Sequence, residues 1–149
     1  MPRQPVPLDS IDDHPGIAFG LADDLAPFAS EWHRHRHHQL LYAARGAMLL
    51  ETRAGRWLLP PQRMAWIRGG TEHRVTATGP LALRTVYMAP RLTRGPAAPC
   101  AVMEVSPLAR EMLIEAMRWG PEQDSGGDVP RAFFAALAAL TGEWAAAPA

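Results

Sequence analysis

The sequence has a single cysteine, Cys100, among its 149 residues. A disulfide within the chain needs two cysteines, so no disulfide framework supports the fold, and a lone thiol suits a reducing compartment. A chain of this length is one ordinary domain, large enough to bury a real core. We therefore expect one domain that is stabilised by packing.

Long apolar segments are also missing. The longest apolar run, residues 132–140, has nine residues, whereas a membrane-spanning helix needs about 20. The stretch MPRQPVPLDSIDD at the start has no apolar core of the kind found in signal peptides. We therefore expect no membrane partner and a cytoplasmic location.

Lysine is absent: all fifteen basic residues are arginines, and fifteen acidic residues balance them to a formal net charge of zero. Residues 31–74 are locally basic, with eight arginines against three glutamates. Scattered arginines of this kind do not make the continuous basic stripe that binds phosphates. We expect this chain by itself not to bind DNA.

The middle of the chain reads as short β-strands. Apolar runs are separated by Gly and Pro at hairpin spacing, with no helical pattern between them. The predicted strands cover residues 39–45, 47–53, 56–59, 63–67, 73–78, 81–89 and 100–105. The apolar piece at residues 16–20 predicts an edge strand. Many short strands without helices between them indicate a sandwich or barrel.

Two helices are predicted after the strands. Ser106 and Pro107 form a typical helix start, and apolar residues follow at helical spacing up to Trp119. A second helix is predicted from about Pro130 to Trp144. The predicted fold class is thus mainly β, a barrel followed by two C-terminal helices.

Four of the six histidines lie within six positions, in the stretch HRHRHHQLLYA. In an extended strand, residues two apart share a face. His33, His35, His37 and Gln39 would then lie on one face, and His38 on the other. Three imidazoles and an amide in a row are a plausible metal cradle. The alternative is a solvated patch of histidines without a ligand.

A second histidine-containing segment follows about thirty residues later, in the sequence GGTEH that ends at His73. Together the two segments resemble the two cupin motifs, whose metal ligands converge inside a small barrel. The matching positions are His33, His35, Gln39 and His73. Gln39 stands where cupins usually have Glu, so the resemblance implies a site with less negative charge. The implied ion is a divalent transition metal, Zn, Ni, Fe or Cu.

Longer segments indicate which group of cupin domains the chain resembles. Four blocks carry a more specific resemblance: HQLLYAARGAMLLET, RWLLPPQRMAWIRGGTEHRV, LALRTVYMAP and CAVMEVSPLAREMLIEAM. Over roughly residues 30–119, the chain is similar to the N-terminal cupin domain of AraC-type transcription regulators. The resemblance implies a sensory and dimerising domain. It divides the chain into an arm with an edge strand (residues 1–30), a cupin barrel (31–105) and a two-helix dimerisation segment with a linker-like end (106–149). The DNA-binding helix-turn-helix half is absent from these residues.

Other residues are candidates for secondary roles. His37 shares the predicted metal-facing side and is a possible second-shell group or alternative ligand. Arg84, Trp66 and Met88 are possible effector-pocket residues, although most Trp and Met in barrels simply pack. Parity along the strand around Arg84 does not say which side faces inward.

Three hypotheses remain for the function. The first is a regulatory domain that binds a metal or small effector in the barrel and forms a homodimer, without catalytic activity. We expect the dimer to use an apolar stripe on the second helix: Phe133, Leu137, Leu140 and Trp144. The second is a small stand-alone cupin enzyme, a dioxygenase or isomerase, which needs an open metal position and a general base. The third is a dimerising domain without a ligand.

Overall fold

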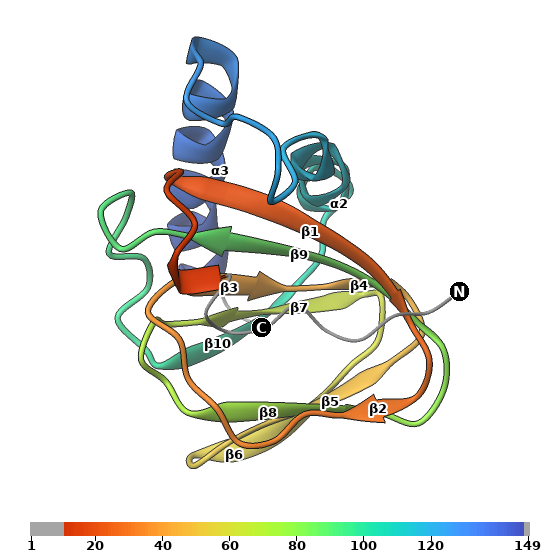
Figure 1. The fold of residues 1–149 in the computed structure, drawn as a ribbon. Coiled ribbons are helices and arrows are strands. Elements are labelled where there is room, and N and C mark those ends of the chain that lie inside the picture. The colour runs from red at the N-terminus through yellow and green to blue at the C-terminus, as the bar shows by residue number, and fades with distance from the viewer. Residues whose placement is uncertain (1–10, 148–149) are drawn as a thin grey trace.

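Two antiparallel β-sheets face each other and make up the body of the protein (Figure 1). The structure, a computed structural model, describes residues 11–147. Sheet A has the strand order β1-β9-β3-β7-β10, with β4 also paired to β9, and sheet B has the order β2-β8-β5-β6. The strands are β1 (Ala18–Leu25), β2 (Phe28–Ala29), β3 (His38–Leu41), β4 (Ala43–Arg45), β5 (Met48–Thr52), β6 (Gly55–Leu59), β7 (Arg63–Ile67), β8 (His73–Ala77), β9 (Leu81–Met88) and β10 (Cys100–Glu104).

The predicted fold class, a mainly β, cupin-like arrangement followed by two helices, is confirmed. The strand at 63–67 has the predicted bounds, and most of the others differ by one residue. The segment predicted as one strand at 39–45 is two strands, β3 and β4, and the pairing of β4 with β9 shifts register between Ala43 and Arg45. Such a bulge bends a strand and lets it turn the corner of a barrel.

The edge strand near the N-terminus is longer than predicted. β1 pairs with β9 along its whole length, from Ala18 opposite Met88 to Leu25 opposite Leu81. Two adjacent aspartates interrupt its apolar pattern, but Asp23 faces inward and Asp24 outward, as in any strand. The short strand β2 was not predicted. The division of the chain at residues 30 and 105 stays a prediction, and residues 1–10 and 148–149 lie outside the described part.

The space between the sheets is filled mainly by aliphatic side chains. This inner core includes Leu41, Leu50, Leu59, Ile67 and Val75. Burying each large apolar side chain contributes roughly 1.5–3 kcal/mol. The packing leaves one end of the sandwich to polar groups, and that end holds the histidines.

The two helices lie on the outer side of sheet A, whereas within residues 11–147 no helix covers sheet B (Figure 1). α2 (Pro107–Glu115) begins as predicted, because the Ser106 hydroxyl accepts a hydrogen bond from the Ala109 amide at 3.1 Å. A short 3₁₀ turn (Ala116–Arg118) follows α2. Among residues 11–147 no helix is long and apolar enough to cross a membrane.

The second helix, α3 (Asp128–Ala146), packs on its own sheet. Phe134 and Leu137 are fully buried in a cluster with Trp66 and Met88 of sheet A. The apolar stripe of the second helix was predicted to form the dimer contact. For Leu137 this prediction is wrong, because its side chain packs within its own chain. The outer face of sheet A is wide enough for both helices, and α3 uses its most apolar face there.

Candidate functional site

Three histidines from two distant segments meet at one end of the sandwich. His33 and His73 form an isolated β-bridge, in which each backbone N–H donates to the carbonyl of the other at 2.9 Å. The ring centroids lie 4.3 Å apart for His33 and His73, and 5.1 Å apart for His35 and His73. One ring nitrogen of each histidine lies within 4.8 Å of the other two. The structure thus brings three of the four predicted ligands into one cluster.

The backbone sets which nitrogen of each ring carries the proton. Nδ1 of His33, His35 and His73 lies 2.8 Å from the carbonyl oxygen of Glu31, His37 and Thr71, respectively. A carbonyl can only accept, so each Nδ1 donates and each neutral ring keeps a lone pair on Nε2. Anchoring of this kind is what metal-binding histidines use to fix the ring and its tautomer.

Burial keeps His35 and His73 in the neutral form that a metal requires. His73 is 1% exposed and His35 is 4% exposed. The pKa of His73 is lowered to about 3, mainly by burial and in part by the neighbouring imidazoles of His33 and His35. Burial also lowers the pKa of His35. Neither ring has to release a proton before it binds an ion at neutral pH.

Gln39, the fourth predicted ligand, turns its carbonyl oxygen toward the cluster. The Gln39 amide nitrogen donates to the Thr85 hydroxyl at 3.1 Å and to the Tyr87 hydroxyl at 3.3 Å. The Thr85 hydroxyl already donates to the Leu40 carbonyl at 2.7 Å, so toward Gln39 it can only accept. This contact fixes the amide orientation and leaves Oε1 of Gln39 3.2 Å from Nε2 of His35.

Two acceptor atoms therefore face each other at His35. A neutral imidazole has one N–H, and the shorter contact, with the His37 carbonyl, uses it. Nε2 of His35 and Oε1 of Gln39 then have no hydrogen between them, which is unfavourable unless a cation binds both. Three imidazole nitrogens and an amide oxygen suit a divalent transition ion.

His37 does not face the cluster, contrary to its predicted parity. Residues 34–37 form a loop and β3 begins only at His38, so strand alternation does not apply to them. The ring of His37 lies against Asp12, with Nδ1 3.2 Å from the carboxylate oxygen. His37 contributes its backbone carbonyl to His35 instead. His38 faces away, as predicted, and its ring bonds Gly69 and Thr93.

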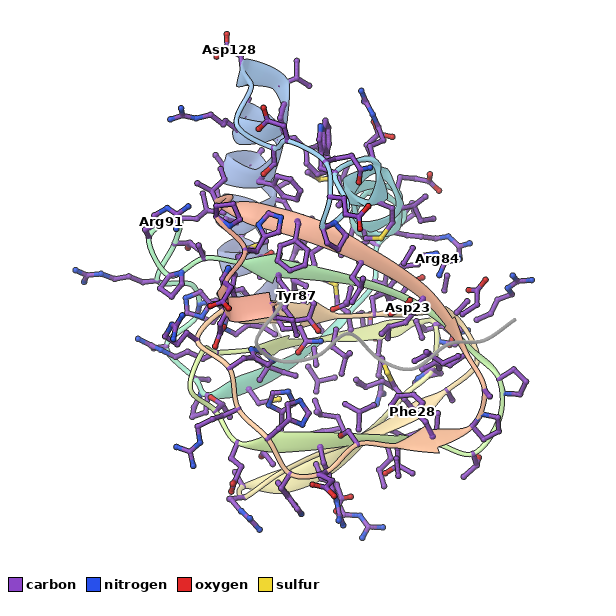
Figure 2. The ribbon with its side chains drawn as sticks, in the orientation of Figure 1. Asp23, Phe28, Arg84, Tyr87, Arg91 and Asp128 are labelled. Atoms are coloured by element: carbon purple, nitrogen blue, oxygen red, sulfur yellow. The ribbon has the colours of Figure 1, made fainter. Side chains whose placement is uncertain are left out.

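A cavity of about 370 Å³ adjoins the cluster. It is lined by Ile11, Leu21, Asp23, Leu25, Phe28, Ser30, Glu31, Trp32, His33, Gln39, Leu41, His73, Val75, Leu83 and Tyr87. Most of the wall is apolar, and the candidate ligands His33, Gln39 and His73 form one part of it. Tyr87 and Asp23 lie in the region between the sheets in Figure 2.

The three predicted effector-pocket residues do not line this cavity. Trp66 and Met88 are fully buried on the other side of sheet A, against the helices. Arg84 also faces outward, where its guanidinium pairs with Asp24 at 3.1 Å (Figure 2). The inward side of β9 carries the alternate residues, Leu83 and Tyr87.

Sequence reasoning missed four residues of this region: Asp12, Asp23, Trp32 and Tyr87. The alternation along β9 contained the signal for Tyr87, which shares the parity of Leu83. Trp32 immediately precedes His33 in the sequence, and this position next to a predicted ligand was a signal that it lies near the site. Nothing in the sequence places Asp12 or the buried Asp23 at the site, because both depend on how the N-terminal strand folds over the barrel.

Comparisons with known proteins identify the family of this chain. The family model described as "AraC-like ligand binding domain" matches residues 15–140. The HTH-type transcriptional regulator NimR of Escherichia coli (strain K12) is 32% identical over 98 residues, which cover 66% of this chain and 36% of NimR. The chain therefore corresponds to about a third of this curated relative.

Solved structures support the fold. Apo ToxT K231A from Vibrio cholerae has a TM-score of 0.59 at 6% identity, over 86% of this chain and 56% of that chain. Wild-type ToxT with an unsaturated fatty acid bound has a TM-score of 0.57 at 6% identity, over 86% of this chain and 54% of that chain. At such identities the likeness concerns the fold alone. Together with the family match, it shows that the chain belongs to the AraC-like ligand-binding domain family.

Proposed function

We propose that this domain is the metal-dependent effector sensor of an AraC-type transcription regulator. Nε2 of His33, His35 and His73 would hold one divalent transition ion, with Oε1 of Gln39 as a weaker fourth ligand. The observation that carries the proposal is the common anchoring of the three rings. All three Nδ1 atoms donate to backbone carbonyls at 2.8 Å, which turns three lone pairs toward one point.

The effector would bind in the adjoining cavity, next to the ion. The proposed ligands His33, Gln39 and His73 line the cavity, so a molecule inside it reaches the ion from that side. The volume of about 370 Å³ suits a small molecule, and the apolar wall suits one with a hydrocarbon part. The ToxT structure with a bound unsaturated fatty acid is a precedent for an apolar ligand in a protein that contains this fold.

The proposal includes a regulatory and not a catalytic role. Within the described residues, the metal cluster contains no carboxylate ligand, and we expect no metal-dependent turnover of small phenols, thiols or keto acids. A homodimer, a cytoplasmic location and DNA binding through a separate helix-turn-helix region complete the proposal. The DNA-binding part is supported by the similarity to NimR, an HTH-type transcriptional regulator.

Metal titration of the purified domain tests the proposal. Chelator-treated protein should bind one equivalent of Zn²⁺, Ni²⁺, Fe²⁺ or Cu²⁺ per chain, measured by calorimetry and elemental analysis. The His35→Ala variant should lose this site. The His14→Ala variant is the matched control, because His14 bonds Pro121 and Gly16 away from the cluster and should leave binding unchanged. Substoichiometric binding of every ion by the wild-type domain would contradict the proposal.

A further inference from the structure

We propose that Asp12 is a positioning residue for the metal site: its carboxylate fixes the loop at residues 34–37, and through the His37 carbonyl it sets the orientation of the His35 ring. The inference deepens the proposed function and rests on it. His35 needs such support because it lies in a loop, whereas the backbones of His33 and His73 pair with each other in a β-bridge.

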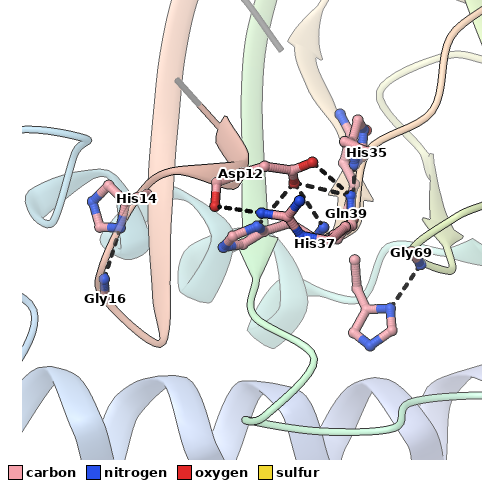
Figure 3. A network of polar contacts seen from close by, with 9 residues as sticks. Asp12, His14, Gly16, His35, His37, Gln39 and Gly69 are labelled. Carbon is pink, nitrogen blue, oxygen red and sulfur yellow. Dashed lines mark hydrogen bonds and ion pairs between the residues drawn. The ribbon is translucent and has the colours of Figure 1, made fainter. Parts of the chain in front are cut away.

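The carboxylate of Asp12 gathers the donors of two successive residues (Figure 3). Its two oxygens accept from the Arg36 amide at 2.9 and 3.0 Å. Oδ1 also accepts from the His37 amide at 3.1 Å and lies 3.2 Å from Nδ1 of the same residue. Hydrogen bonds to an ionised acceptor are roughly twice as strong as neutral ones. No other side chain within residues 11–147 bonds to these two amides.

His37 is consequently held on both sides of its carbonyl group. Asp12 holds its amide and its ring, and β3 begins at the next residue, where His38 pairs with Met88. The carbonyl between these two anchors has little freedom. It accepts from Nδ1 of His35 at 2.8 Å and so determines where Nε2 of that ring points.

The opposite side of the loop is closed by a glycine turn. The Gly70 amide donates to the His35 carbonyl at 2.8 Å. A Cβ atom placed on Gly69 would lie 2.0 Å from the Arg36 carbonyl oxygen. The turn can therefore approach the loop this closely only because Gly69 has no side chain. The loop is thus held between Asp12 and the turn at Gly69 and Gly70. Removing the carboxylate frees one of these two sides.

This arrangement predicts a graded set of metal affinities. Loss of an outer group that orients a ligand weakens metal binding by about 10–100-fold, and we expect an effect of that size for Asp12→Ala. Asp12→Asn keeps one acceptor oxygen and should fall between Asp12→Ala and the wild type. His37→Leu keeps the carbonyl that bonds His35 and should weaken binding less than Asp12→Ala. Asp13→Ala, at an exposed neighbouring position, is the control and should bind as the wild type does.

The experiment measures Zn²⁺ affinity of the full chain by competition with a chromophoric chelator, and it follows the His35 ring by ¹⁵N–¹H NMR in the metal-free protein. Circular dichroism confirms that each variant is folded. In the wild type the Nδ1–H signal of His35 should be protected from exchange, and Asp12→Ala should lose that protection. A folded Asp12→Ala with wild-type affinity and an unchanged His35 signal would overturn the inference. If the wild type binds no metal, the proposed function fails, and the NMR comparison still decides whether Asp12 positions the ring.

Discussion

Replacing Leu137 by Ala tests whether α3 belongs to the core of its own chain. Leu137 is fully buried in the cluster between α3 and sheet A, beside Phe134 and Ala138. Truncating a leucine at such a site removes its transfer free energy and leaves a cavity, at a cost of about 2–5 kcal/mol. We expect a loss of about 3 kcal/mol, equivalent to roughly 6–12 °C in melting temperature for a chain of this size.

Urea unfolding followed by circular dichroism measures this loss. The matched control is Leu108→Ala in α2, the same chemical change at a position that is 55% exposed, where we expect a change within about 0.5 kcal/mol. Both variants should be compared at two protein concentrations that differ tenfold. If Leu137 packs against its own sheet, the loss is the same at both. A loss below about 1 kcal/mol, or one seen only as a concentration dependence, would refute the reasoning and favour an intermolecular contact.

Two further predictions concern the metal ligands. With chelator present, the free energy of unfolding should fall as the pH drops below 6.5, because burial holds the pKa of folded His73 at about 3 while the unfolded chain takes up the proton at its ordinary value. The contribution of His73 to this fall is at most about 1.4 kcal/mol per pH unit. Chemical denaturation between pH 7 and pH 4.5 should show that the His73→Gln variant lacks this contribution. Parallel pH profiles of the wild type and the variant would contradict the prediction. Gln39→Glu should bind Zn²⁺ more tightly but be less stable without metal, because a carboxylate has no N–H for the Thr85 and Tyr87 hydroxyls. Unchanged stability in chelator would show that those two bonds contribute little.

The sequence was a good guide to the strands and to the identity of the clustered histidines. Apolar runs between Gly and Pro located seven strands, because turns require particular residues and strands require alternating apolar side chains, and both patterns can be recognised locally in the sequence. The site was found through His73, which a resemblance to known motifs connected to His33 and His35. Spacing alone would not have linked segments forty residues apart.

Parity failed where the backbone leaves the strand. The argument for His37 assumed an extended chain from His33 onward, but the carboxylate of Asp12 and the turn at Gly69 hold residues 34–37 as a loop. For Arg84 the alternation was sound, yet nothing local to β9 says which face meets the helices. Both errors concern tertiary contacts with segments far away in the sequence.

The most direct test of the account is a crystal structure of the metal-loaded domain with diffraction data collected at the absorption edge of the bound ion. We predict one anomalous peak per chain, about 2.0–2.1 Å from Nε2 of His33, His35 and His73, with Oε1 of Gln39 turned toward it. An empty cluster at saturating metal, or a peak bound to other residues only, would contradict the central claim.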